Sequence, residues 1–296
     1  MKISLIVTNW NGLSFIKKNL ETVIKNSPEA SELIFIDDGS QDDSVAYVSE
    51  LQKKYPVIKI LKNSTNQGFV KSSNRAVAAA TGELVVLLNN DIYPHPKYIK
   101  STLKHFNDLQ VLGVGFSELG HENYGRIFWQ NGYLQIKEGF TNSTHISAWL
   151  SGGSSIIRRD YFLKLGGFDQ VYEPFYFEDL DFGLRAWRSG YKLLWEPKSV
   201  VEHHHESTTS RFPRKFLVYV KERNHLISVL RNITDPKLLF ENKIFSFLRI
   251  LSGPNYLKII LAAHRQLKKY PPSICFPQRS DKDILKLFEN EKKAKN

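Results

Sequence analysis

The chain has 296 residues and is 42% hydrophobic, which is enough for one large domain with a smaller appendage. Its one cysteine, Cys275, excludes a disulfide framework and a cysteine zinc site and fits a reducing compartment. The longest apolar run, residues 257–263, is far shorter than the roughly 20 residues that cross a bilayer, and a strand-like run already begins at Lys2. We therefore expect a cytoplasmic protein without a signal peptide or a membrane span.

The formal net charge of +11 is concentrated near the C-terminus. Residues 211–296 carry 19 Lys and Arg against 7 Asp and Glu, whereas residues 1–210 carry 22 against 23. A basic segment of this kind is typical of proteins that bind a polyanionic surface, either a membrane or a nucleic acid. We therefore expect a main domain at 1–210 and a basic extension at 211–296.

The first 116 residues alternate between short apolar runs and helix-patterned stretches. The predicted strands are residues 3–8, 33–37, 57–61, 83–88 and 111–116. The predicted helices between them are residues 13–26, 43–54, 69–80 and 96–107. This alternation predicts an α/β fold with a mostly parallel central sheet. Because the strands are nearly continuous apolar runs, helices should cover both faces, and ligands should bind at the carboxyl ends of the strands.

The rest of the chain is less regular. Residues 117–160 predict loops with one or two antiparallel strands. A helix is expected at 177–189, followed by short strands at 192–195 and 199–201. From residue 213 onward the pattern is helical, basic and amphipathic, with breaks at Gly253-Pro254 and Pro271-Pro272.

Polar side chains follow three of the predicted strands. These segments are Thr8-Asn9-Trp10-Asn11-Gly12, Asp37-Asp38-Gly39-Ser40 and Asn89-Asn90-Asp91. Because the carboxyl ends of parallel strands meet at one edge of a sheet, a single site there accounts for all three. Asp91 could hold a divalent cation that bridges two phosphates, and Asp38 could accept a hydrogen bond from a nucleobase. The alternative for both segments is a turn rich in Asn and Asp.

Glu178-Asp179-Leu180-Asp181 opens the helix expected at 177–189. Asp179 shares a helix face with apolar residues, where a carboxylate costs free energy unless it has a partner or a function. Partial desolvation would raise its pKa toward a value that suits a general base. Asp181 and Arg185 lie four residues apart on another face, and such a pair is worth only about 0.2–0.5 kcal/mol.

Three further segments are candidates for the same site. In the run His203-His204-His205, one imidazole directed inward, that of His203, could complete the coordination of a metal held by Asp91, and a solvated loop is favoured for the other two. Ser151-Gly152-Gly153-Ser154 and Gly166-Gly167-Phe168-Asp169 predict tight turns that would let a substrate approach the main chain. Simple loop chemistry is the alternative for both turns.

Taken in order, these motifs resemble family 2 glycosyltransferases, which adopt the GT-A fold, and in particular bacterial rhamnosyltransferase- and galactofuranosyltransferase-like members. The matching segments are residues 7–12, 37–40, 66–69, 89–91, 151–153, 166–169 and 178–181, with Asn74 and His203. The resemblance covers residues 1–210, and Glu222-Arg223-Asn224-His225 resembles an element of the first C-terminal helix in many members. Each motif is short, but the ordered set is specific.

The resemblance implies an inverting, metal-dependent transfer of a sugar from a nucleoside diphosphate, of UDP or dTDP type, to an acceptor hydroxyl. Implied nucleotide-sugar-binding residues are Thr8, Asn9, Asp38, Asn66, Asn74, Asn89, Asn90, Gly152 and Gly153. By the same resemblance, Asp91 and His203 bind Mn²⁺ or Mg²⁺ and Asp179 is the catalytic base, while Glu178 orients the acceptor. Asn89 stands where the family often has the first acid of an Asp-X-Asp motif.

The implied acceptor is a growing cell-surface saccharide or a polyprenyl-linked saccharide. The apolar and basic residues of 237–251 and 257–269 would then lie on the inner face of the cytoplasmic membrane. The alternative is that these helices pack on the catalytic domain with a solvated basic face.

Two other functions are compatible with parts of this pattern. A nucleotidyltransferase acting on a sugar phosphate would share the α/β sheet, but the sequence has no Gly-rich basic loop after its first strand and no P-loop. A basic nucleic-acid-binding module fits the charge of 211–296, but no recognised nucleic-acid motif accompanies it, and no nucleic-acid partner is expected.

Overall fold

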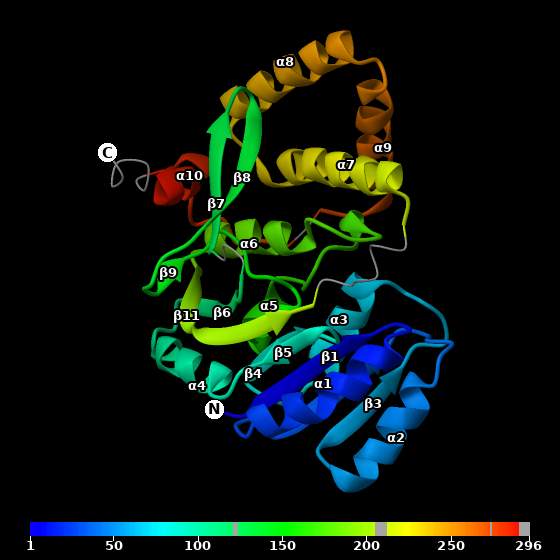
Figure 1. The fold of residues 1–296 in the computed structure, drawn as a ribbon. Helices are drawn as coiled ribbons and strands as arrows, with labels where there is room; N and C mark the ends of the chain where they lie inside the picture. Colours follow the sequence, from blue (N-terminus) through cyan, green and yellow to red (C-terminus); the bar gives the residue numbers. More distant parts are fainter. Residues whose placement is uncertain (121–123, 205–211, 273, 290–296) are drawn as a thin grey trace.

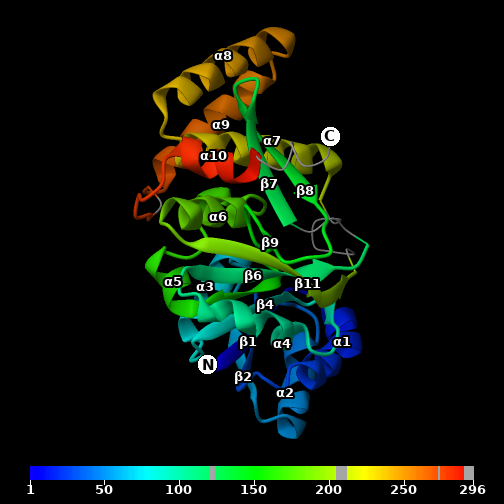
Figure 2. The same ribbon diagram turned by 90° about the vertical axis from the view of Figure 1, so that its left-hand side faces the viewer.

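The computed structural model describes residues 1–120, 124–204, 212–272 and 274–289. One end is a mixed sheet with helices on it, and the other end is built mainly from the C-terminal helices (Figures 1 and 2). The main sheet has nine strands in the order β3-β2-β1-β4-β10-β6-β11-β5, with β9 paired to β11. These strands are β1 (Ile3–Asn9), β2 (Glu32–Asp37), β3 (Ile58–Lys62), β4 (Leu84–Asn89), β5 (Ile92–Pro94), β6 (Val111–Glu118), β9 (His145–Ile146), β10 (Ser154–Arg158) and β11 (Lys192–His203).

The N-terminal half is the predicted βαβ unit. β1 pairs in parallel with β2 and β4, and β2 pairs in parallel with β3. The connecting helices are α1 (Leu13–Asn26), α2 (Ser44–Lys54) and α3 (Phe69–Ala79). The buried side chains form two clusters, one containing Ile16 of α1 and the other Val70 of α3. Because the central strands contribute to both clusters, their apolar runs are continuous and not alternating.

β10 makes the sheet mixed. It lies antiparallel between β4 and β6, with Ser154 opposite Leu88. This register brings the end of the preceding turn to the end of β4, where Asn89 N donates to the Gly153 carbonyl at 3.0 Å. The predicted sheet is therefore confirmed as mostly parallel, with one central antiparallel strand that aligns a glycine turn with the strand ends.

The prediction of two separate strands at 192–195 and 199–201 is wrong. They form the single strand β11, whose register shifts between Glu196 and Val200. Glu196 is buried at this bulge and accepts hydrogen bonds from Thr144 and His105, so the irregularity is held by side chains and does not end the strand. The predicted helix at 96–107 is α4 (Tyr98–Thr102) followed by a 3₁₀ helix, Leu103–Asn107.

A hairpin in residues 117–160 projects toward the C-terminal helices (Figure 1). It consists of β7 (Tyr124–Gln130) and β8 (Tyr133–Gly139). Between them, Asn131 and Gly132 have φ values of 55° and 74°, as a two-residue hairpin turn requires. The Asn-Gly pair marks this turn in the sequence.

Two short helices and a longer one follow β10. They are α5 (Arg159–Lys164), the 3₁₀ helix Gln170–Tyr172 and α6 (Glu178–Arg188). The predicted pairing of Asp181 with Arg185 is confirmed at 2.7 Å, but the expectation of a minor contribution is wrong. Asp181 is fully buried and also accepts bonds from Tyr172 Oη and Asn232 Nδ2. Removing one partner of such a pair typically costs about 3–5 kcal/mol.

The extension is helical, as predicted, and the predicted breaks fall between helices. Its elements are α7 (Arg214–Asn232), α8 (Pro236–Ser252), α9 (Tyr256–Lys269) and α10 (Asp281–Glu289). α7 packs on α6, and Asp281 of α10 pairs with Arg188 of α6. α8 lies at the far end of the molecule from β1–β3 (Figures 1 and 2). Within the described ranges, none of the helices is both long enough and apolar enough to span a bilayer.

The packing of α6 predicts the effect of one substitution. A Cβ atom on Gly183 would overlap the carbonyl oxygen of Ala148 and lie 2.9 Å from Cα of Trp149. Although Ala favours a helix over Gly by about 1 kcal/mol, Gly183→Ala should lower the free energy of unfolding by about 1–3 kcal/mol, because backbone must move. Urea denaturation measures the change.

Gly253→Ala is the matched control, because its Cβ atom would meet its nearest neighbour at 3.9 Å. Equal stability of the two variants would show that α6 is free to shift away from Ala148.

Candidate active site

The polar segments after β1, β2 and β4 meet at one edge of the sheet. Thr8 Oγ1 donates to Asn89 Oδ1 at 3.2 Å. Asn9 Nδ2 donates to Asp37 Oδ2 at 3.1 Å, and Asn90 Nδ2 donates to Asn9 Oδ1 at 2.7 Å. Asn9 is buried and bonded at both ends of its amide, so it ties the strand ends together. Thr8 and Asn89 are partly exposed, which leaves them accessible at the edge.

Asp38 holds the loop between β3 and α3. Its carboxylate accepts hydrogen bonds from Asn63 Nδ2 at 2.7 Å and from the backbone N–H groups of Gln67 and Gly68, both at 2.8 Å. Asn66 is exposed at the tip of this loop, and its Oδ1 accepts from Gly68 N at 3.0 Å. Asp38 therefore positions Asn66 at the rim of the candidate site.

The turn Ser151-Gly152-Gly153 closes against these strand ends. A Cβ atom on Gly153 would overlap the side-chain amide of Asn89, and one on Gly152 would lie 3.1 Å from the ring of Phe69. A side chain at position 153 would therefore displace Asn89, and one at position 152 would be a tight contact with Phe69.

Asp91 and His203 are far apart in the sequence. They come together because β5 and β11 pair, with His203 opposite Ile92. His203 Nε2 lies 3.4 Å from Asp91 Oδ1, and His203 Nδ1 lies 2.9 Å from Glu118 Oε2. Ser154 Oγ in turn donates to Glu118 Oε1 at 2.5 Å. One imidazole is thus held between two carboxylates.

The carboxylates of Asp91 and Glu118 favour a positive charge on His203. Burial alone would lower the pKa of His203, but its bonds to Asp91 and Glu118 outweigh burial and raise the pKa to about 9. Asp91 Oδ1 is buried and has no well-aligned hydrogen-bond donor. A carboxylate oxygen and an imidazole nitrogen are donor atoms that suit Mn²⁺. Among the described residues no group of three His, Cys, Asp or Glu side chains is arranged so that all three could hold one metal ion. A cation here would therefore need further ligands from water or a bound diphosphate.

Glu178 and Asp179 begin α6 after an unusual backbone. Tyr176 and Phe177 have φ values of 72° and 78°. Glu178 is buried, its Oε2 has no hydrogen-bond partner among the described residues, and burial followed by the charge of Asp179 raises its pKa. Burial also raises the pKa of Asp179 to about 6, although the Leu180 N–H donates to its Oδ1 at 2.8 Å and opposes the shift. A carboxylate with a pKa near neutrality is suited to accept a proton.

A row of aromatic rings connects α6 to the glycine turn. Phe182, one turn after Asp179, packs on Phe168 with ring centroids 5.7 Å apart. Phe168 packs on Phe69 at 5.9 Å, and Phe69 lies against Gly152. These contacts link the start of α6 to the Ser151–Gly153 turn, which lies against Asn89 at the end of β4.

Asn74 has a different contact from the one that the resemblance implies. Its Nδ2 donates to the Phe168 carbonyl at 2.8 Å, and its Oδ1 accepts from Phe168 N at 2.9 Å. Because both ends of the amide are bonded to one backbone position, Asn74 fixes the Gly166–Asp169 turn against α3, and we leave it out of the proposed donor-binding set.

One group near the site, Glu118, has no signal in its local sequence, and a second, Asn224, is indicated only by the resemblance of residues 222–225 to a C-terminal helix element. Glu118 ends β6 as an isolated acid, and only the pairing of β6 with β11 brings it to His203. Asn224 of α7 is fully buried against the segment before α6. His204 is exposed, and His205 lies outside the described residues.

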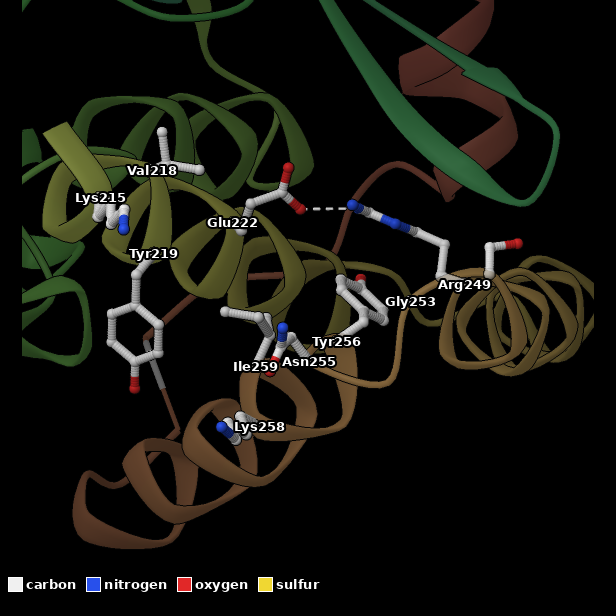
Figure 3. Close-up of a pocket in the computed structure, with 11 residues that line it drawn as sticks. Lys215, Val218, Tyr219, Glu222, Arg249, Gly253, Asn255, Tyr256, Lys258 and Ile259 are labelled. Carbon is white, nitrogen blue, oxygen red and sulfur yellow. Dashed lines mark hydrogen bonds and ion pairs between the residues drawn. The ribbon is translucent and has the colours of Figure 1, made fainter.

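A cleft of about 650 Å³ lies away from this edge, between α7, α8 and α9 (Figure 3). Glu222 and Arg249 form an ion pair of 2.7 Å across it. None of the residues predicted for the active site lines this cleft.

Comparisons with known proteins identify the family of the chain. A family model, described as Glycosyl transferase family 2, matches residues 4–166. The O-antigen chain rhamnosyltransferase RfbN of Salmonella typhimurium is 25% identical over 227 residues, which are 73% of this chain and 71% of that protein. The N-acetylglucosaminyl-diphospho-decaprenol L-rhamnosyltransferase of Mycobacterium tuberculosis is 31% identical over 140 residues, which are 47% of this chain and 42% of that protein. Other curated relatives are longer, and the chain spans only 30–38% of their length.

The fold is that of GT-A glycosyltransferases, which confirms the predicted fold class. The mannosyltransferase PcManGT from Pyrobaculum calidifontis, solved in complex with GDP-Man and Mn²⁺, aligns with a TM-score of 0.59 at 16% identity. The alignment covers 89% of this chain and 75% of that one. At this identity the likeness shows the fold alone.

Proposed function

The chain belongs to glycosyl transferase family 2, and on that basis we propose that it transfers a sugar from a nucleoside-diphosphate sugar to an acceptor hydroxyl with inversion. The observation that carries the proposal is the pair of carboxylates in contrasting surroundings. Asp91 lies beside His203, whose pKa is raised to about 9, whereas Asp179 is partly buried at the start of α6. Family membership favours this reaction over the nucleotidyl transfer and nucleic-acid binding considered above.

In the proposed reaction Asp179 is the general base. It takes the proton of the acceptor hydroxyl while that oxygen attacks the anomeric carbon from the face opposite the diphosphate. The new carbon–oxygen bond forms as the bond to the diphosphate oxygen breaks, so one displacement inverts the configuration. Glu178, whose raised pKa favours the protonated form, donates a hydrogen bond that orients the acceptor.

We propose that Asp91 and His203 hold Mn²⁺ or Mg²⁺, and that His203 loses its proton when the cation binds, because only a neutral imidazole is a ligand. A bound cation would neutralise charge on the departing diphosphate. The chain's own contribution is a buried carboxylate oxygen and an imidazole oriented by Glu118. Thr8, Asn66, Asn89 and the Ser151–Gly153 turn line the donor side, and Asp38, Asn9 and Asn90 hold these groups in place.

The donor in this proposal is of UDP or dTDP type, and the acceptor is a saccharide or a polyprenyl-linked saccharide. Two relatives named as rhamnosyltransferases, one acting on an O-antigen chain and one on a decaprenol-linked sugar, support this class of acceptor. Thermal shift with UDP-, dTDP- and GDP-sugars in Mn²⁺ distinguishes the donors, because a ligand that binds the native state raises its melting temperature.

The extension supplies a membrane surface in this proposal. One face of α8 packs on the β7–β8 hairpin, where Phe245 stacks on Tyr133 with centroids 4.7 Å apart. The opposite face has five apolar side chains that are 46–67% exposed: Phe240, Ile244, Phe247, Leu248 and Leu251. Lys237 and Lys243 are exposed on the same side of the helix. An apolar stripe flanked by lysines suits an anionic membrane surface.

Asp179→Asn should reduce turnover by about 10²–10⁴-fold, the usual contribution of a general base, while binding of UDP with Mn²⁺ stays near that of wild type. Wild-type kcat should fall as the pH drops through about 6, where the Asp179 carboxylate gains a proton. Nucleotide release from a panel of UDP- and dTDP-sugars measures both effects.

Asp43→Asn, a change at an exposed aspartate before α2, is the control. Normal turnover in Asp179→Asn would remove this residue from the base role.

Asp91→Ala should abolish the increase in UDP affinity that Mn²⁺ gives to the wild-type protein, because the buried carboxylate ligand is lost. Calorimetry of UDP binding with and without Mn²⁺ measures the effect independently of turnover. His204→Ala is the control, since His204 is exposed beside His203. Retained Mn²⁺ stimulation in Asp91→Ala would contradict the metal assignment.

Replacing Phe247 and Leu251 of α8 with Glu should abolish flotation of the protein with vesicles that contain phosphatidylglycerol. The substitutions remove apolar area and introduce repulsion from the anionic lipid. Leu109→Glu is the control, because Leu109 is 70% exposed and lies outside the extension. Unchanged flotation of the α8 variant would show that this face does not contact lipid.

A further inference from the structure

We infer that Asn224 of α7 is a positioning residue for catalysis: on the premise that Asp179 is the base proposed above, Asn224 fixes the backbone that presents it. The extension then completes the active site and is not an accessory to it. No local pattern in residues 1–210 indicates this dependence, because the contacts join segments about 50 residues apart.

Asn224 is bonded to three backbone carbonyls in one short segment. Its Nδ2 lies 2.7 Å from the carbonyl oxygen of Tyr172 and 2.9 Å from those of Phe175 and Tyr176. Its Oδ1 accepts from Arg223 Nη2 at 2.8 Å, and Asn224 is fully buried. The amide is therefore saturated, and water has no access to replace it.

The segment that Asn224 holds has a backbone that requires external support. Tyr176 and Phe177 are consecutive residues with positive φ, and each such residue costs on the order of 1–3 kcal/mol. Glu178 and Asp179 follow directly, so the direction in which α6 starts depends on these two peptide units. A change in either φ value would re-aim the Asp179 carboxylate.

Neighbouring residues of α7 hold the two ends of the same segment. Arg223 Nη2 donates to the Glu173 carbonyl, and Asn232 Nδ2 donates to Asp181 Oδ1 at 2.8 Å. His225 stacks on the Phe177 ring with centroids 5.0 Å apart. Burial lowers the pKa of His225 to about 4, so a neutral ring lies against Phe177. α7 thus contacts the segment from Tyr172 to Asp181 along its length.

Removal of the Asn224 amide would take its two N–H donors away from three backbone carbonyls, of which the Tyr172 carbonyl is in a buried bond and the other two are in partly buried ones. Each unsatisfied buried group costs about 1–3 kcal/mol, which the loop can reduce by abandoning the positive φ values of Tyr176 and Phe177. A displacement of roughly 1 Å at a reacting group can cost about 10²-fold in rate. Asn224→Ala should therefore impair the chemical step more than donor binding.

The test compares Asn224→Ala with Asn242→Ala. Asn242 is a matched control, because it is also a buried asparagine of the extension, and its Nδ2 donates to the Gly132 carbonyl at 3.0 Å, in the hairpin turn. The readouts are UDP affinity with Mn²⁺, kcat for nucleotide release, and the pH at which kcat falls on the acid side.

Asn224→Ala should keep wild-type UDP affinity and lose about 10²-fold in kcat. The pH at which kcat falls on the acid side (the acid limb) should move from about 6 toward the ordinary aspartate pKa of about 4. Asn242→Ala should keep the wild-type kcat and pH profile. Wild-type kcat and acid limb in Asn224→Ala, or equal changes in both variants, would overturn the inference. Should Asn224→Ala fail to fold, Asn224→Ser, which retains one donor, is judged by the same readouts.

The two proposals fail in different ways. If Asp179→Asn turns over normally, Asp179 is not the base and the proposed function fails. If Asp179→Asn is inactive while Asn224→Ala has wild-type kcat and acid limb, the base assignment stands and only the role of Asn224 is lost.

Discussion

The antiparallel pairing of β10 with β4 is the constraint on which the candidate site depends. It puts the Gly153 carbonyl on Asn89 N and so closes the glycine turn over the ends of β1 and β4. The same strand begins with Ser154, whose hydroxyl holds Glu118 against His203. A parallel strand at this place would begin at the opposite edge of the sheet, so the turn that precedes it could not reach the end of β4.

In the proposed reaction the two carboxylates have different roles because their surroundings differ. Asp91 faces an imidazole whose pKa is raised to about 9, so the negative charge of Asp91 is balanced by a positive one. Asp179 is partly buried beside Glu178, and burial raises its pKa. In this proposal Asp91 lies on the side of the departing diphosphate and Asp179 takes the proton of the acceptor.

The helices of the extension differ in how they pack. α7 and α10 pack on α6 through buried polar contacts, among them Asn232 with Asp181 and Asp281 with Arg188. α8 instead leaves an apolar face exposed at the end of the molecule. Packing on the catalytic domain therefore applies to α7 and α10, and the membrane contact proposed for the extension involves the exposed face of α8.

Local sequence determined the strand and helix order, the turns at Gly152-Gly153 and Asn131-Gly132, and the grouping of Thr8, Asp38 and Asp91 at one edge. These follow from the periodicity of apolar residues, from the conformational freedom of glycine and from the rule for parallel strands. Tertiary structure alone decided that Asp181 is buried, that Asn74 is bonded to backbone, that Glu118 contacts His203, and that Asn224 contacts the segment before α6. Each of these depends on a partner between 9 and 94 residues away, and burial and hydrogen bonding at that range are set by how the elements pack, which local spacing does not encode.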